Sequence, residues 1–217
     1  MNILALETSG AVLSVALAAS EKYWEMNINR GFKHGETLMP AVSRLLEDAG
    51  LKPADLDLIA CAAGPGSFTG LRIGMATAKG IARGADCPME AVLTLPLLAA
   101  GREHWPGIVA PVMDARKKRV YAAAFKNGKR VASDADMDLD EFMESLPGDD
   151  PVLVTGPDAR IALGRPRVIL DPLYASGRAL QMIAAARAAF DIEGPDPSDM
   201  GPLYLRLSEA EEALAKS

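Results

Sequence analysis

A strand, a glycine-rich loop and a helix follow one another between residues 56 and 83, and this succession most constrains the fold. Residues 56–62 form an apolar run that predicts a buried strand, and the loop that follows, residues 64–74, reads GPGSFTGLRIG. A helix is expected over residues 71–83. Glycines at such a junction let the backbone approach a phosphate group or another segment of protein closely.

The loop matches none of the catalytic motifs that it resembles at first sight. Its glycines have the wrong spacing for a P-loop, and Leu71 and Arg72 follow where that motif needs lysine and serine or threonine. Thr69 replaces the third glycine of the dinucleotide fingerprint, and Pro65 and Thr69 flank Ser67 where a nucleophile elbow needs glycines. Anion binding stays open, because Ser67 and Thr69 can cap the helix while its first N–H groups remain available.

The expected helix carries small residues at every fourth position, at Gly70, Gly74, Ala78 and Ala82. These residues share one face of a helix, and Gly74 costs about 1 kcal/mol relative to alanine in a helix interior. Such a face lets another segment come close, either within the domain or from a partner. If the segment belongs to a partner, Gly74→Leu blocks the complex and leaves the chain folded.

Composition and charge exclude several classes of protein. The 217 residues are 49% hydrophobic, which is enough for one large domain or two small ones, and the net charge of −6 disfavours nucleic-acid binding by the chain alone. Cys61 and Cys87 lie in apolar contexts without a C-x-x-C motif, as in reduced cytosolic proteins. The first residues lack a basic region and reach Glu7, so no signal peptide is expected, and no apolar run approaches the roughly 18 residues of a membrane helix. We therefore expect a cytoplasmic protein without a membrane association.

The order of predicted elements repeats along the chain. The first half, residues 1–103, is predicted to hold strands at 2–7, 12–19, 23–28, 56–62 and 89–93 and helices at 36–48, 71–83 and 95–103, with Pro40 in the first turn of its helix. The second half, residues 104–217, is predicted to hold strands at 108–113, 119–125, 129–133, 152–155 and 167–170 and helices at 138–146, 158–163 and 175–190. An extended segment at 203–207 and a short helix from Glu209 complete this half.

Each half opens with a hairpin whose first strand ends in an acid, at Glu7 and at Asp114. This pattern resembles the actin/Hsp70/sugar-kinase superfold, so we expect an α/β fold of two ribonuclease-H-like halves with mixed sheets. Within that superfold, the chain resembles the bacterial TsaB family, also known as YeaZ-type or glycoprotease-like proteins. The segments that carry this resemblance, in the family's order, are residues 3–9, 34–40, 64–80, 113–116 and 204–206.

The resemblance implies a role in threonylcarbamoyl transfer to the tRNA adenosine beside the anticodon. In this role the chain is a non-catalytic partner and activator of the transferase TsaD, with which it forms a heterodimer. The resemblance also implies a TsaE-type ATPase in the larger complex and contact with tRNA only through that complex. Relatives of this kind often form homodimers when alone, and the sequence leaves open whether the isolated chain is a monomer or a homodimer. No tightly bound cofactor is expected, while ATP or ADP can bind in the complex.

The catalytic groups of two alternative functions are missing from the sequence. The metal-bearing relative uses H-x-x-x-H, and Thr94 and Leu98 stand at those positions here. His34 and His104 lie in different segments and are expected at the surface, so a metallopeptidase is disfavoured. An ATP-binding phosphotransferase or ATPase remains as an alternative from the superfold alone. The basic turn at residues 116–119 replaces the phosphate-binding glycines of sugar kinases and is expected to be a solvated turn, although it could touch tRNA or a partner.

We therefore predict that the functional residues form a partner interface rather than a catalytic or metal site. In the TsaB family this interface comes from the two helices that flank the glycine loop. The interface residues predicted here are Leu38, Met39, Val42, Leu45, Gly70, Arg72, Gly74 and Ala78. A nucleotide or anion contact at the junction is predicted for Glu7, Ser67 and Thr69, with hydrogen bonding to the hairpin backbone as the stronger expectation for Glu7.

Overall fold

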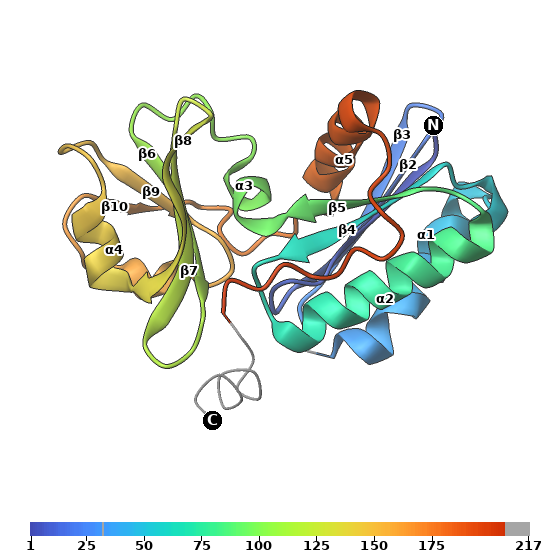
Figure 1. Cartoon of the computed structure of the whole chain (residues 1–217), viewed down its shortest axis with the longest axis horizontal. Helices are drawn as coiled ribbons and strands as arrows, with labels where there is room; N and C mark the ends of the chain where they lie inside the picture. Colours follow the sequence, from blue (N-terminus) through green and yellow to red (C-terminus); the bar gives the residue numbers. More distant parts are fainter. Residues whose placement is uncertain (32, 207–217) are drawn as a thin grey trace.

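The computed structural model describes residues 1–31 and 33–206, which form two five-stranded mixed sheets (Figure 1). In the first sheet β1 lies at the centre, antiparallel to β2 and parallel to β4. The strands of this sheet follow the order β3-β2-β1-β4-β5 and are β1 (Ile3–Glu7), β2 (Leu13–Ala19), β3 (Lys22–Ile28), β4 (Leu58–Gly64) and β5 (Met89–Leu93).

The second sheet repeats this topology strand for strand. Its order is β10-β9-β6-β7-β8, with β6 antiparallel to β7 and parallel to β9. The strands are β6 (Ile108–Asp114), β7 (Arg119–Lys126), β8 (Lys129–Asp138), β9 (Val152–Thr155) and β10 (Val168–Leu170). The predicted α/β fold of two ribonuclease-H-like halves with mixed sheets is therefore confirmed.

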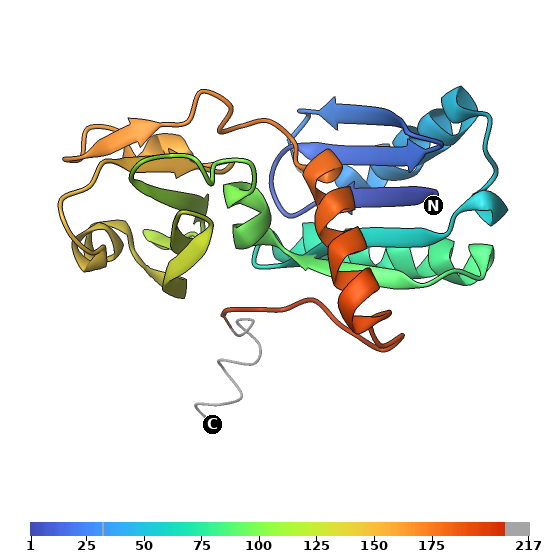
Figure 2. The same ribbon diagram turned by 90° about the horizontal axis from the view of Figure 1, so that it is seen from above.

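Helices cover both faces of each sheet. On the first sheet, α1 (His34–Ala49) and α2 (Phe68–Ala85) lie side by side on one face, and α5 (Ala179–Glu193) crosses the other (Figures 1 and 2). On the second sheet, α4 (Leu139–Ser145) and the 3-10 turn η2 (Ala159–Ala162) pack on one face and α3 (Thr94–Ala99) on the other. A further 3-10 turn, η1 (Pro53–Asp55), precedes β4.

The packing of α3 and α5 cuts across the predicted division at residues 103 and 104. The helix α5 follows the second sheet in sequence but returns to the first, where Met182 and Ile183 are buried against it. The helix α3 precedes the division but packs on the second sheet, where Leu95 and Leu98 lie in one apolar cluster with Val109. Each sheet thus completes its core with a helix from the other part of the sequence.

A buried ion pair lies where the chain crosses between the halves. The Arg102 guanidinium contacts the Asp171 carboxylate at 2.7 Å, and Thr155 donates a hydrogen bond to the same carboxylate at 2.7 Å. Arg178, which precedes α5, lies 3.8 Å from this carboxylate and is almost fully buried. These contacts join the connection before β6 to the connection before α5.

Several predicted boundaries are shifted. The helix α1 begins at His34, two residues before the prediction, so Pro40 lies in the second turn rather than the first. Gly50 ends α1 in the left-handed conformation at φ +68°, and residues 159–162 form a 3-10 turn instead of an α-helix. The helix predicted from Glu209 lies outside the described residues. Within residues 1–31 and 33–206, no helix combines the length and the apolar character that a bilayer crossing requires.

Candidate partner surface and the cleft between the halves

The small-residue face of α2 points into the chain's own core. A Cβ atom added to Gly70 would lie 2.2 Å from the carbonyl oxygen of Thr8, and one added to Gly74 would lie 2.2 Å from Thr8 Oγ1. Ala78 is fully buried in the same core. The placement of Gly70, Gly74 and Ala78 at a partner interface is therefore wrong. Their small size lets α2 approach the turn between β1 and β2.

The apolar face of α1 is also internal. Leu38, Val42 and Leu45 are 1%, 2% and 3% exposed and pack in the core of the first half. The prediction that these three residues contact a partner is wrong, because their helical spacing marks the side of α1 that faces the sheet. Met39, the other residue predicted on α1, remains 48% exposed.

One strip of the surface that α1 and α2 present to solvent carries small and flexible side chains. We call this surface the outer face and define it by Gly35, Met39, Ile73, Ala76 and Gly80. The two helices adjoin there, since a Cβ atom on Gly35 would lie 3.8 Å from Ile73 Cδ1. A Cβ atom on Gly80 would meet nothing within 4 Å. The sequence carried a signal for this surface in the small residues on the side of α2 opposite Gly74, at Ala76 and Gly80.

Arg72 is exposed, as an interface residue must be, but it already contacts the chain's own C-terminal segment. Its guanidinium lies 3.8 Å above the centre of the Phe68 ring, and its Nε donates a hydrogen bond to the Tyr204 hydroxyl at 3.0 Å. The rings of Phe68 and Tyr204 lie 5.1 Å apart. These contacts give the segment at residues 204–206, whose role the sequence left unexplained, a place at the start of α2.

A cleft of about 450 Å³ lies between the two halves. The turn after β1, the start of α2 and the end of β6 line it, and it includes Ser67 and Thr69 but not Glu7. Ser67 Oγ accepts a hydrogen bond from the Gly70 amide at 3.2 Å and so caps α2, as predicted.

Glu7 and His34 hold the turn after β1 from inside the protein. The Ser9 amide and hydroxyl both donate to Glu7 Oε1, the amide at 2.8 Å, which confirms the predicted hydrogen bond to the hairpin backbone. Burial raises the pKa of Glu7, and the Ser9 hydrogen bonds and nearby positive groups offset part of this increase.

His34 is 1% exposed, and its Nε2 donates a hydrogen bond to the Gly10 carbonyl at 2.7 Å. The prediction that His34 lies at the surface is therefore wrong. His104 is exposed, as predicted.

The charges that line the cleft are mixed. Arg116 faces it together with Asp114 and Asp158, and Asp158 Oδ2 accepts a hydrogen bond from the Asp114 amide at 2.8 Å. Burial raises the pKa of Asp158, the Asp114 charge adds to this effect, and the hydrogen bond opposes it. A phosphate group placed here would meet two carboxylates as well as one arginine.

The described residues contain no cluster of three or more histidine, cysteine, aspartate or glutamate side chains arranged to hold a metal ion. At the positions where a metal-bearing relative has histidines, Thr94 is fully buried at the start of α3, and Leu98 lies in the apolar cluster against β6. Neither side chain is a metal ligand of the usual kind.

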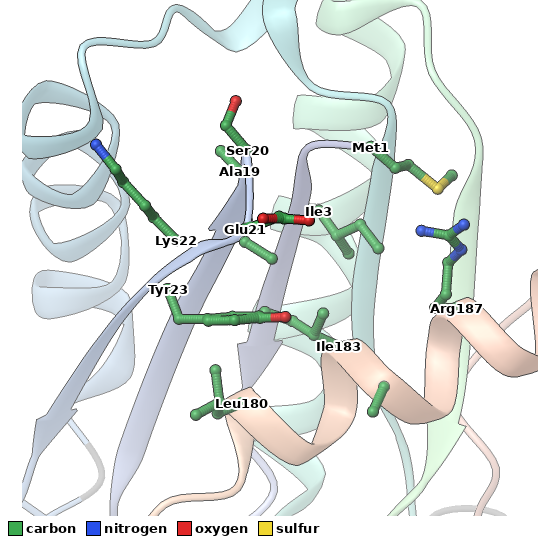
Figure 3. A pocket seen from close by; sticks show the side chains of 12 residues that line it. Met1, Ile3, Ala19, Ser20, Glu21, Lys22, Tyr23, Leu180, Ile183 and Arg187 are labelled. Atoms are coloured by element: carbon green, nitrogen blue, oxygen red, sulfur yellow. The ribbon is translucent and has the colours of Figure 1, made fainter.

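An apolar groove of about 380 Å³ lies on the opposite side of the first sheet from α1 and α2. Figure 3 shows the Tyr23 ring and the side chains of Ile183 and Leu180 along it, with Arg187 towards Met1. It shares no residue with the cleft between the halves. The groove is therefore a separate surface feature formed by α5 and the hairpin of β2 and β3.

Comparison with known proteins decides the family. The chain is 36% identical to the "tRNA threonylcarbamoyladenosine biosynthesis protein TsaB" of Bacillus subtilis, in an alignment that covers all of this chain and 99% of that protein. The chain belongs to the TsaB family. The Escherichia coli protein of the same description is 37% identical over 58% of this chain and 55% of its own length.

The TsaB assignment agrees with two further comparisons. Residues 31–196 match the family described as "TsaD: tRNA N6-adenosine threonylcarbamoyltransferase", so the chain also belongs to that wider family. The solved structure of "YeaZ from Pseudomonas aeruginosa" superimposes with a TM-score of 0.80 at 29% identity and covers 94% of this chain and 99% of that one. The resemblance inferred from five sequence segments is thereby confirmed, and with it the actin/Hsp70/sugar-kinase-like superfold.

Proposed function

We propose that the chain is a non-catalytic partner and activator of a TsaD-type transferase that modifies the tRNA adenosine beside the anticodon. The observation that carries this proposal is the full-length similarity to the Bacillus subtilis TsaB, which is named for threonylcarbamoyladenosine biosynthesis. A TsaE-type ATPase joins the larger complex, in the cytoplasm, and the chain reaches tRNA only through that complex. Its net charge of −6 supports this indirect contact.

The outer face is the surface through which the chain binds the transferase in this proposal. Helices pack at about 8–10 Å between axes, and small residues at the contact permit the closest approach. Ala76 and Gly80 provide small positions on α2, and Met39 provides a flexible apolar side chain that adapts to a partner surface. The same face on two copies of the chain forms the homodimer when no transferase is present.

The cleft between the halves supports a non-catalytic role. Its lining combines one arginine with two carboxylates, and Ser67 already caps the helix that a phosphate would approach. We infer that the chain holds no cofactor tightly by itself and that ATP or ADP binds in the assembled complex. The alternative, an ATP-binding phosphotransferase or ATPase of the same superfold, is supported by the position and size of this cleft.

Reconstitution from purified proteins tests the proposal. We expect modified tRNA from the chain together with a TsaD-type transferase, a TsaE-type ATPase, a threonylcarbamoyl donor and ATP, measured by mass spectrometry of the nucleosides. Omission of the chain should abolish the product, and the chain alone should form no product and hydrolyse no ATP. Equal product without the chain would refute the activator role, and ATP turnover by the chain alone would favour the alternative.

A further inference from the structure

The segment that follows α5 ties the first half of the molecule to the second. We call residues 195–206 the strap. It leaves the end of α5 and runs towards the second sheet (Figures 1 and 2). The Leu203 amide donates to the Ala63 carbonyl at 2.7 Å, and a Cβ atom on Gly64 would lie 2.4 Å from the Leu203 carbonyl oxygen. The strap thus packs directly on the end of β4.

The far end of the strap holds the second half. Arg206 places both ends of its guanidinium on the Asp136 carboxylate, with two hydrogen bonds of 2.6 Å, and donates a third to the Ala115 carbonyl at 2.9 Å. Asp136 lies on β8 and Ala115 follows β6. Two-point pairing of this kind fixes the orientation of the strap as well as its position.

The near end of the strap rests on β5 through Asp196. The Asp196 carboxylate accepts a hydrogen bond from the Ala91 amide at 2.7 Å, and the Asp196 amide donates to the Met89 carbonyl at 3.2 Å. Between these two strand residues lies Glu90, which is 4% exposed and whose Oε1 has no hydrogen-bond partner among the described residues. A buried carboxyl group therefore lies beside the carboxylate that anchors the strap.

The two carboxylates near Glu90, those of Asp196 and Glu193, act in the same direction as its burial. Burial is the largest cause that raises the pKa of Glu90 to about 7, and the negative charge of Asp196 is the next. The charge of Glu193, on α5, raises this pKa further, while a hydrogen bond from the Asp196 backbone lowers it. On the α2 side, Lys79, Arg83 and Asp86 line a pocket together with Asp196.

We propose that the strap is a proton-dependent latch, held on β5 while Glu90 is protonated and loosened when Glu90 and Asp196 both carry a negative charge. A carboxyl group whose pKa is raised in the closed state favours that state at low pH, and the advantage is lost as pH rises towards about 7. The latch connects α5, the start of α2 and the second sheet, so its release loosens the attachment of one half to the other. This inference concerns the isolated chain and does not depend on the proposed transferase.

Hydrogen exchange at the two strap contacts tests the latch. The amides to follow are those of Ala91 and Leu203, with each rate divided by its intrinsic rate at the same pH. If Glu90 titrates near 7 when the strap is closed and near 4.5 when it is open, protection should fall about tenfold between pH 6 and pH 8. In Glu90→Gln the fall should be less than about twofold, because the neutral amide cannot ionise.

A matched control and a direct titration keep the result decisive. Glu47→Gln changes an exposed glutamate on α1 and should retain the tenfold fall. In the unmodified chain, the side-chain carboxyl group of Glu90, followed through its carbon-13 NMR signal, should titrate near 7. A titration near 4.5, or a fall in protection that is equal in Glu90→Gln and in the unmodified chain, would overturn the latch.

Discussion

Gly74→Ala should destabilise the protein, although the same change in an open part of the helix should stabilise it. The new methyl group would lie 2.2 Å from Thr8 Oγ1 and 3.3 Å from Thr8 Cβ, and Thr8 is fully buried. Overpacking of this kind costs about 1–3 kcal/mol, and alanine returns about 1 kcal/mol of helix propensity. We therefore expect a net loss of about 1 kcal/mol in the free energy of unfolding, measured by urea denaturation.

Gly80→Ala is the matched control, because Gly80 lies in the same helix and a Cβ atom there meets nothing within 4 Å. It should gain up to about 1 kcal/mol, so the two alanine variants should differ by about 2 kcal/mol. Equal stabilities of the two variants would refute the inward packing of the small-residue face.

A second substitution at Thr8 identifies the contact itself. Thr8 Oγ1 has no hydrogen-bond partner among the described residues, so Thr8→Ala removes the clashing oxygen without breaking a described hydrogen bond. The combination of Thr8→Ala with Gly74→Ala should be more stable than the sum of the single changes predicts, by about 1 kcal/mol or more. Additive effects would show that the two residues do not touch.

Three further predictions concern the core and its polar contacts. Leu45→Ala should lower the free energy of unfolding by about 2–5 kcal/mol in urea denaturation because Leu45 is buried in the first half, and a cost below about 1 kcal/mol would place it at the surface. Arg102→Met should cost about 3–5 kcal/mol by the same measurement because it leaves the Asp171 carboxylate buried with a main partner missing, and an unchanged stability would contradict the buried pair. Burial raises the pKa of Cys61 to about 12, so at pH 8 iodoacetamide should modify Cys87 well before Cys61 by mass spectrometry, and the reverse order would contradict this burial.

The architecture followed from the sequence because its signals are local and repeated. Alternation in strands, the helical spacing of Leu38, Val42 and Leu45, and the hairpins whose first strands end at Glu7 and Asp114 each indicate an element within a few residues. The crossing of α3 and α5 between the sheets could not be predicted in this way. It depends on which sheet offers an uncovered apolar face, and this is set by residues far along the chain.

The site predictions were also limited to what local sequence signals indicate, because contacts between residues far apart in the chain leave no such signal. The small-residue stripe correctly indicated a close approach, but its partner, Thr8, lies more than sixty residues away and nothing in the stripe names it. The burial of His34 likewise depends on its hydrogen bond to the Gly10 carbonyl, and no sequence pattern near His34 indicates this distant partner. Apolar periodicity marks the face that a helix buries, so the partner surface proposed here lies on the opposite, exposed side of α2, at Ala76 and Gly80.

The central claim, that the outer face binds a TsaD-type transferase, is tested most directly by calorimetric titration with Ala76→Glu. Ala76 is exposed, so the variant should keep its unfolding midpoint, while a carboxylate buried at the interface should weaken binding by at least about tenfold. Ala184→Glu makes the same change at an exposed alanine of α5, across the sheet, and should bind as the unmodified chain does. Unchanged affinity in Ala76→Glu would contradict the claim.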